Sequence, residues 1–471
     1  MNVLVVGSGG REHAFVKALS TSADLDRLLA APGNPGMAAL AECFDVAADD
    51  VPGQVALAKE HGVGLVVVGP EGPLVAGLVD ALQNAGIPAL GPNKAAAHLE
   101  GSKSFMKDMC RRARIPTAFS KAFNEVAEAL AYVGSHDRWP SVIKADGLAA
   151  GKGVLIVHGC KEASVAIRDI MLNSRFGKAG HRILIEDFLE GEEISVIALV
   201  DGETISVLEA SCDHKRAFDG DRGPNTGGMG AYSPSRLLTP RVYGQIEERI
   251  LVPTVHAMSR EGRPFQGILY VGLMLTIEGP FVLEYNVRGG DPEMQVLLPR
   301  LESDALGLFY ATATGGLEEF GEVEWSPLTA CGVVLADGGY PETTTPGELI
   351  RGIKNAEAMD NVFVYQAGTK AFGPHVKTAG GRVLCVTGLG HGLEGAREVA
   401  YKAVEKIQFE GMRYRTDIGW RELAPRPTAA DPGEPTISEP SSTEPRTSEP
   451  RTTEPRTTEP RTTEPRTTGG E

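Results

Sequence analysis

The stretch VLEYNVRGGDPEMQ (282–295) joins an expected strand to an acidic, glycine-rich loop. Residues at i, i+2 and i+4 of a strand share one face. Glu284, Asn286 and Arg288 should therefore point the same way, at the rim of a sheet. Oxygen ligands beside a fixed cation suit a magnesium ion that carries nucleotide phosphates. A solvated strand face with an incidental ion pair is the alternative interpretation of this row.

The size of the chain predicts several domains. Its 471 residues allow two to four domains with buried cores. Hydrophobic residues make up 42% and charged residues 23%, which is ordinary for a globular protein. No apolar run reaches the roughly 18 residues of a membrane span, and MNVLVVGSGG lacks the basic start of a signal peptide. We therefore expect no membrane partner.

Charge and cysteine content narrow the class of partner and the compartment. A net charge of −16 argues against a nucleic-acid partner, because binding a polyphosphate backbone requires a basic surface. The six cysteines lie far apart without a CxxC pair, which favours free thiols and argues against structural zinc. We expect a cytoplasmic protein.

The first hundred residues alternate strands and helices. Apolar strands are expected at 3–7, 25–31 and 64–69, followed by a helix around 74–85 and a short strand at 87–91. Apolar strands without polar alternation, separated by helices, indicate a parallel sheet that is covered on both faces.

The remainder of the chain predicts two more folded parts and a tail. Mixed α+β patterns run from Lys103 to about 299, and strands from 331 onward precede a helix with an apolar stripe. The EPRTT repeat between Glu444 and Thr468 prevents helices and paired strands, which indicates disorder. We predict an N-terminal α/β domain (1–102), a central domain (103–324), a small C-terminal α+β domain (325–423) and a disordered tail (424–471).

GSGGREHA (7–14) is a glycine-rich turn that leads from a strand into a helix, where backbone amides can hold an anion. A dinucleotide fingerprint fails here, because its third glycine falls at Glu12 and LLAAPGN (28–34) offers no acid for a ribose hydroxyl. A single phosphate is the more suitable ligand for this turn. The alternative is a tight turn that binds no ligand. Arg11 and Glu12 are candidate ligand contacts or simple surface charges.

Two further segments suit a nucleotide. VIKADGLAAGKGV (142–154) places Lys144 on a strand before a loop of small residues that can fold over a triphosphate. It is not a Walker A loop, because Gly153 follows Lys152 where Ser or Thr is required. In ILIEDFLEGEEISV (183–196), backbone groups can pair with an adenine edge and a carboxylate with ribose hydroxyls. An ordinary hairpin and a solvent-facing acidic turn are the respective alternatives.

DHKRAFDGDRGPNTGGMGAYSP (213–234) is a long polar segment of a kind that is usually functional or disordered. Asp213, Lys215 and Arg216 can meet the ammonium of an amino acid and a carboxylate or phosphate. His214 receives no role, since a lone histidine is more often structural.

Five motifs occur in one order: GSGGREHA, KADGLAAGKGV, EDFLEGEEIS, GPNTGGMGAYSP and EYNVRGGDPE. Together they resemble the phosphoribosylamine–glycine ligase (glycinamide ribonucleotide synthetase) family of ATP-grasp enzymes, from residue 1 to about 421. The resemblance implies a parallel-sheet pre-ATP-grasp domain, an ATP-grasp domain and a small C-terminal domain. It implies that ATP joins glycine to 5-phosphoribosylamine, giving glycinamide ribonucleotide, ADP and phosphate through glycyl phosphate, in de novo purine biosynthesis.

The resemblance also implies roles for individual residues. Glu284 and Asn286 would bind Mg²⁺ or Mn²⁺, and Arg288 and Lys144 would act in catalysis. The implied ATP-binding residues are Lys103, Lys144, Gly151, Lys152, Gly153, Glu186 and Glu193. The implied substrate-binding residues are Gly9, Gly10 and Arg11 for the 5′-phosphate, with help from GGR (380–382), and Asp213, Lys215, Arg288, Gly290 and Asp291. We expect a monomer.

Two departures from the family pattern and three rival interpretations accompany this resemblance. Met274 stands on the preceding strand, where many ATP-grasp enzymes have a second metal carboxylate. Gly289 replaces a bulky apolar residue, which should loosen the backbone beside Arg288.

The rival interpretations are an ATP-grasp ligase for formate or bicarbonate, a regulatory protein that has lost catalysis, and an interaction protein centred on the tail.

Overall fold

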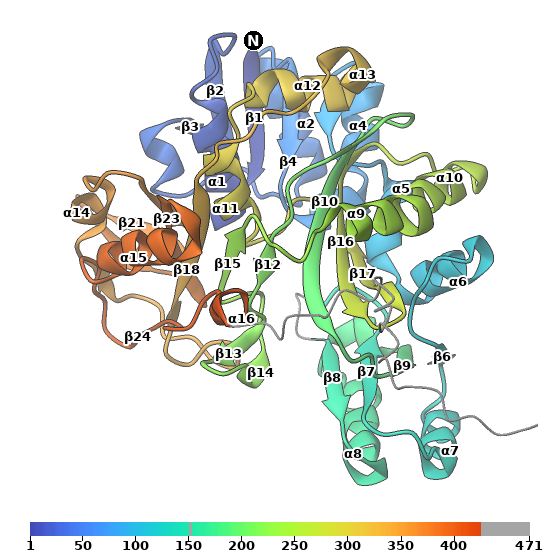
Figure 1. The fold of residues 1–471 in the computed structure, drawn as a ribbon. Helices are drawn as coiled ribbons and strands as arrows, with labels where there is room; N and C mark the ends of the chain where they lie inside the picture. The colour runs from blue at the N-terminus through green and yellow to red at the C-terminus, as the bar shows by residue number, and fades with distance from the viewer. Residues whose placement is uncertain (150–152, 425–471) are drawn as a thin grey trace, which may run out of the picture. The chain divides into compact units, whose positions relative to one another are not determined.

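The computed structural model describes residues 1–149 and 153–424, which are drawn in colour in Figure 1. Residues 1–424 form one compact unit. The N-terminal part contains a five-stranded sheet in the order β3-β2-β1-β4-β5, and every neighbouring pair is parallel, as predicted. Its strands are β1 (Asn2–Gly7), β2 (Arg27–Pro32), β3 (Glu42–Cys43), β4 (Leu65–Val68) and β5 (Ala89–Leu90).

Helices cover both faces of this parallel sheet. Val3 and Val5 of β1 pack in one core cluster with Phe15 and Phe309, whereas Leu4 and Val6 pack in the other. The expected helix at 74–85 is interrupted at Gly77, whose φ of +100° is left-handed and ends the first helix. The surrounding helices are α1 (Gly10–Leu19), α2 (Val51–Glu60), α3 (Glu71–Ala76), α4 (Leu78–Asn84) and α12 (Ala305–Thr314).

The central part contains two antiparallel sheets of four strands. The first has the order β6-β9-β7-β8 (Ser120–Phe123, Ile183–Asp187, Ser141–Ala145, Val154–Val157), with α7 (Val126–Ser135) and α8 (Cys160–Met171) packed on it. The second has the order β11-β10-β16-β17 (Ile205–Val207, Glu192–Val200, Gly267–Thr276, Gly279–Asn286). The nearby helices are α5 (Lys94–Gly101), α6 (Lys103–Ala113), α9 (Pro240–Ile246) and α10 (Val252–Arg260).

The C-terminal sheet takes in strands from the central part of the chain. Its order is β12-β15-β18-β23-β20, with β24 beside β18, and all its pairs are antiparallel. The strands are β12 (Cys212–Asp213), β15 (Gly230–Ser233), β18 (Thr329–Asp337), β20 (Val362–Gln366), β23 (Arg382–Gly390) and β24 (Met412–Arg413), and α15 (Gly392–Val404) packs on β18 and β23. The polar segment 213–234 therefore begins and ends in this sheet.

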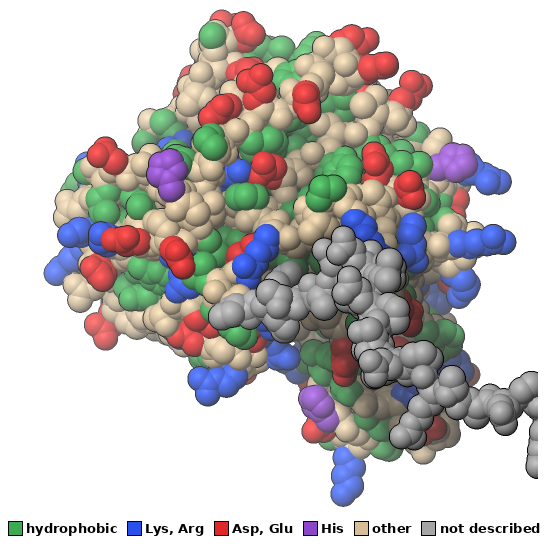
Figure 2. All heavy atoms as spheres, in the orientation of Figure 1, with side chains coloured by type: hydrophobic (Ala, Val, Ile, Leu, Met, Phe, Trp, Pro, Cys, Tyr) green, Lys and Arg blue, Asp and Glu red, His purple; other side chains and the backbone are tan. Residues whose placement is uncertain are grey.

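The surface of the folded part carries mixed charge. Figure 2 shows mainly Asp and Glu side chains over the upper part of one face, and Lys and Arg side chains interspersed with them across its middle and lower part. Within the described ranges, no helix is both long and apolar enough to cross a bilayer.

Candidate active site

The hairpin of β16 and β17 positions Glu284 and Asn286, the first two residues of the predicted row. Glu284 lies opposite Gly272, and a β-bulge follows between Gly272 and Leu273. A Cβ on Gly272 would lie 3.3 Å from Glu284 Cγ, so glycine leaves room beside the carboxylate. Met274 pairs with Phe281 instead. The expectation that Met274 takes the place of a second carboxylate is therefore wrong, because the register that begins at Tyr270 and Asn286 makes Gly272 the neighbour of Glu284.

Three lysines from separate elements surround Glu284. Lys144 comes from β7, Lys103 begins α6, and Lys215 follows β12. Burial would raise the pKa of Glu284, but Lys215, Lys144 and Lys103 outweigh burial and lower it. Among the described residues, no cluster of three or more His, Cys, Asp or Glu side chains can hold a metal ion. The oxygens of Glu284 and Asn286 fit a hard divalent cation only if phosphate oxygens complete its shell.

Two acidic residues of the N-terminal region hold Arg288. Its guanidinium lies 3.2 Å from Glu100 and 3.3 Å from Glu71. Burial opposes the charge of Arg288, but these carboxylates raise its pKa. Arg288 lies just beyond β17, yet it donates a hydrogen bond of 3.2 Å to Asn286 Oδ1, so the expected row is formed. Sequence reasoning missed Glu71 and Glu100, which carry no local signal.

Glu186 of β9 anchors a second charged cluster. Its Oε2 lies 2.9 Å from Lys107 Nζ and 3.1 Å from Lys144 Nζ. Its Oε1 is buried, with no hydrogen-bond partner among the residues that the structure describes. Lys144 also donates to the carbonyl of Leu283, which brings this cluster beside Glu284. Sequence reasoning missed Lys107, although it follows Lys103 by four residues and so shares a helix face with it.

The small-residue loop between β7 and β8 is described in part. Gly153 is buried, and its carbonyl accepts a hydrogen bond from the Ala145 amide. Lys103 Nζ donates to the carbonyl of Gly147 at 3.3 Å. The predicted residues Gly151 and Lys152 lie outside the described ranges.

Asp213 and Glu193 meet through Lys215. Lys215 Nζ lies 2.7 Å from Asp213 and 3.4 Å from Glu193. Burial would lower the pKa of Lys215, but Asp213 and other acidic groups raise it well above its usual value.

Glu293 of the GGDPE motif was missed by sequence reasoning. Its carboxylate accepts a hydrogen bond from Ser195 Oγ at 3.3 Å. Burial and the neighbouring Asp213 raise the pKa of Glu293 to about 7.

The glycine turn after β1 is filled by Glu12. The Gly9 amide donates to Glu12 Oε2 at 2.6 Å, and a Cβ on Gly9 would clash with that oxygen. Glu12 is buried, so the interpretation as a surface charge is wrong. Arg11 Nε contacts Glu12, and Arg11 Nη1 donates to the Gly289 carbonyl at 3.0 Å. Gly10 packs against Gln295, so the turn lies against the 289–295 loop.

Arg382 of the GGR motif reaches the same loop. It forms an ion pair of 2.8 Å with Asp291 and donates to the carbonyls of Asp291 and Gly227. Burial would raise the pKa of Asp291, but Arg382 and Arg11 lower it. The two candidate phosphate-binding segments, the glycine turn and GGR (380–382), thus both contact the 289–295 loop.

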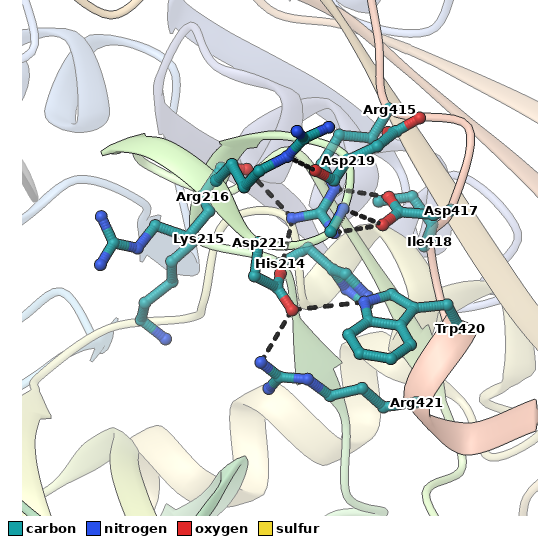
Figure 3. A network of polar contacts seen from close by, with 12 residues as sticks. His214, Lys215, Arg216, Asp219, Asp221, Arg415, Asp417, Ile418, Trp420 and Arg421 are labelled. Carbon is teal, nitrogen blue, oxygen red and sulfur yellow. Dashed lines mark hydrogen bonds and ion pairs between the residues drawn. The ribbon is translucent and has the colours of Figure 1, made fainter. Parts of the chain in front are cut away.

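The RTDIGW segment (415–420) holds the 214–221 segment in place, as Figure 3 shows. The fully buried Arg415 contacts Asp417 at 2.7 Å and Asp221 at 2.8 Å, and donates to the carbonyl of Arg216. His214 Nε2 accepts from the Gly419 amide at 3.1 Å. These contacts fix the backbone on both sides of Lys215.

Models of one protein family match most of the chain. The N domain of phosphoribosylglycinamide synthetase matches residues 1–100, its ATP-grasp (A) domain 101–294, and its C domain 330–421. The chain belongs to the phosphoribosylglycinamide synthetase family. This membership confirms the predicted fold class and the prediction of an ATP-dependent ligase.

Relatives of this synthetase family are similar over nearly their whole length. A phosphoribosylamine–glycine ligase of Caulobacter vibrioides is 50% identical over 427 residues, which cover 90% of this chain and 99% of the relative. One from Rhodopirellula baltica is 49% identical, with 90% and 98% covered.

Solved structures agree with this family assignment. The crystal structure of a phosphoribosylamine–glycine ligase from Thermotoga maritima has a TM-score of 0.78 at 33% identity, covering 89% of this chain and 100% of that chain. The biotin carboxylase domain of a Hydrogenobacter thermophilus 2-oxoglutarate carboxylase has a TM-score of 0.66 at 18% identity, covering 88% and 91%, and shares the fold alone.

Proposed function

We propose that this synthetase-family chain joins glycine to 5-phosphoribosylamine, with conversion of ATP to ADP and phosphate, and releases glycinamide ribonucleotide. The observation that carries the proposal is the convergence of Lys103, Lys144 and Lys215 on Glu284, beside the substrate candidates Asp213 and Arg288. Such a group suits phosphoryl transfer from a nucleotide to a small carboxylate, because it neutralises charge on both reactants.

The nucleotide would lie between the two central sheets. The buried Oε1 of Glu186 would accept from the adenine amino group, and Glu193 of β10 would accept from ribose hydroxyls. Lys103, Lys144 and the loop that contains Gly151, Lys152 and Gly153 would neutralise the phosphates. Glu284 and Asn286 would hold Mg²⁺ or Mn²⁺, which when bound stabilises the charge that develops during phosphoryl transfer.

Glycine would react beside Arg288. A carboxylate is a poor electrophile, so one glycine oxygen first attacks the γ-phosphorus of ATP, and the bond to ADP breaks. Asp213 is suited to the glycine ammonium, while Arg288 and Lys215 can stabilise the resulting glycyl phosphate. The amine of phosphoribosylamine then attacks the carbonyl carbon, loses a proton, and phosphate leaves. Closure of the 219–230 loop would protect this intermediate from water, as would the predicted closure of the 145–153 loop, whose residues 150–152 lie outside the described ranges.

Phosphoribosylamine would bind where the N-terminal turn meets the 289–293 loop. Arg11 and the Gly10 amide are candidates for its 5′-phosphate, with Arg382 close by through Asp291. The Gly9 amide already donates to Glu12, so its part in phosphate binding requires Glu12 to move. Gly290 and Asp291 would line the same pocket. We further propose a cytoplasmic monomer with domains at 1–102, 103–324 and 325–423; the predicted tail (424–471) lies outside the described residues from 425 onward.

An omission assay tests the proposed reaction. ADP release is measured with ATP, Mg²⁺, glycine and freshly generated phosphoribosylamine, and each component is left out in turn. We expect release only when all are present. Release that instead requires formate or bicarbonate would replace the substrate assignment, and ATP binding without turnover would support a regulatory protein. Repeating the assay with Mn²⁺ alone identifies the preferred ion.

A further inference from the structure

Glu186 uses one carboxylate oxygen for cations and leaves the other free. Both Lys107 and Lys144 contact Oε2, at 2.9 and 3.1 Å. Oε1 is buried and has no partner among residues 1–149 and 153–424. A buried acceptor without a partner is costly, so a ligand donor is expected there.

The two lysines differ in how firmly the protein holds them. Lys107 Nζ has three donors, and it contacts Glu186, Thr117 Oγ1 at 2.8 Å and the Ala118 carbonyl at 3.2 Å. Thr117 is itself anchored, because its hydroxyl donates to the Val282 carbonyl at 2.7 Å. Lys144 contacts Glu186 at 3.1 Å and the Leu283 carbonyl at 3.0 Å, next to Glu284 in the chain. Lys107 thus has three partners within the protein and Lys144 has two, which leaves one donor of Lys144 for a phosphate.

We propose that Lys107 is a positioning residue for nucleobase selection, which fixes Glu186 Oε2 so that Oε1 accepts the adenine amino group. This inference rests on the proposed contact between Glu186 and adenine. Once Lys144 engages phosphate, Lys107 remains the cation that is paired with Glu186 Oε2 in this buried site. A charged acceptor favours a 6-amino purine and repels the 6-carbonyl of hypoxanthine or guanine.

Nucleotide pairs that differ only at position 6 test this role. Titration calorimetry of the full chain with Mg²⁺ compares ATP with purine riboside triphosphate, which lacks the amino group, and with inosine triphosphate. We expect the unmodified chain to prefer ATP over the analogue without the amino group by about tenfold or more. Lys107→Met should reduce this preference to less than about threefold, whereas the exposed control Lys161→Met should keep it.

Two further variants separate positioning from general stability or charge. Thr117→Val removes one anchor of Lys107 and should reduce the preference partly, even if Lys107→Met does not fold. Adding Lys107→Met to Glu186→Gln should reduce it no further, because both act through one carboxylate. An unchanged preference in folded Lys107→Met or in Thr117→Val, or an equal loss of affinity for all three nucleotides, would overturn the proposal. If Glu186→Gln itself keeps the preference, the adenine contact of the proposed function is wrong; ligase activity does not enter this test.

Discussion

Glu284 lies among cations rather than among other acids. Its pKa is lowered by Lys215, Lys144 and Lys103 in spite of burial, so it is charged at neutral pH before any ligand arrives. The same carboxylate can therefore bind a divalent cation without first losing a proton. Removing its charge would leave the three lysines to repel one another.

We expect Glu284→Gln to lower the ligase kcat by roughly 100-fold or more, because metal-assisted charge stabilisation contributes several kcal/mol. The measurement is ADP release at saturating substrates over a series of Mg²⁺ concentrations. Glu278→Gln is the matched control, since Glu278 is exposed near the tip of the same hairpin. A kcat within threefold of the unmodified enzyme would exclude Glu284 as a metal ligand.

Gly289 is tightly packed, which contradicts the expectation of a loosened backbone. A Cβ at this position would lie 2.8 Å from Met294 Cγ and 3.0 Å from Phe15 Cζ. The Gly289 carbonyl also accepts from Arg11 and Arg288. The Met294 side chain thus takes the space that a larger residue at 289 would need.

Gly289→Leu alone should lower the free energy of unfolding by about 1–3 kcal/mol, because it overfills the core. Met294→Ala alone should also destabilise, since it leaves a cavity. The double variant should recover part of both losses, because the new side chain fills that cavity. Urea unfolding of the four chains measures this coupling. Additive losses would mean that the two positions do not share space.

At the scale of elements, the RTDIGW segment and the β13–β14 hairpin (Arg216–Phe218 and Arg222–Asn225) behave as one unit. Burial opposes the charge of Asp417, but its hydrogen bonds with Arg415 help to lower its pKa to about 2. Asp221 also accepts from the Trp420 indole and pairs with Arg421, as drawn in Figure 3. Residues 415–421 therefore position Lys215 through the segment on both sides of it.

Arg415→Lys keeps the positive charge but loses the bidentate hydrogen bonds to Asp417. We expect the KM for glycine to rise about tenfold, the equivalent of one charged hydrogen bond. The KM for ATP should stay within twofold, because the nucleotide candidates lie on other strands. Arg351→Lys, at an exposed position of the C-terminal part, is the control. Equal rises in both KM values would indicate a general loss of structure instead.

Across the whole molecule, two buried histidines act as acceptors between distant segments. His13 Nδ1 accepts from the Gln366 amide at 2.8 Å, and His214 Nε2 accepts from Gly419. Burial and the nearby Lys17 lower the pKa of His13 to about 3, while burial and Arg415 lower that of His214 to about 4. Protonation of either of these ring nitrogens would place an N–H donor of the histidine against the N–H donor of the backbone amide. The neutral histidines therefore stabilise the folded state fully above about pH 6.5, the pKa of histidine in the unfolded chain. This stabilisation is lost progressively as the pH falls below that value.

For each of these histidines, lowering the pH from 7 to 5 should lower the free energy of unfolding by about 2 kcal/mol. His13→Gln and His214→Gln should each remove this share of the pH dependence, whatever their effect at pH 7. Urea unfolding at pH 7, 6 and 5 gives the slopes, with the exposed His256→Gln as control. A variant with the same slope as the unmodified chain would show that its histidine is not held neutral.

A chain that ends at Ala424 should keep its kcat and KM values within twofold. The matched family models end at residue 421, and a relative aligns over 427 residues, which cover 90% of this chain and 99% of the relative. Activity assays of both chains, with equal thermal stability as the control, test this. A large loss of ligase activity on truncation would favour an interaction or catalytic role for the tail.

The sequence by itself determined the classes of element and the family. Apolar runs and turn glycines act through neighbouring residues, so they predicted the parallel sheet and the strands of the C-terminal part. Five ordered motifs predicted an ATP-dependent ligase, which family membership confirms. The roles of Lys144, Glu284, Asn286 and Arg288 stay predictions.

Only the tertiary structure decided which distant residues meet. The pairing register of β16 and β17 placed Gly272 beside Glu284. Glu100 and Glu71 form ion pairs with Arg288, and Lys107 forms one with Glu186. Residues 212–213 and 230–233 joined the C-terminal sheet, although the local pattern placed them in the central domain. Strand pairing and buried ion pairs depend on the packing of the complete chain, and no local periodicity encodes which partner each strand or charge will find.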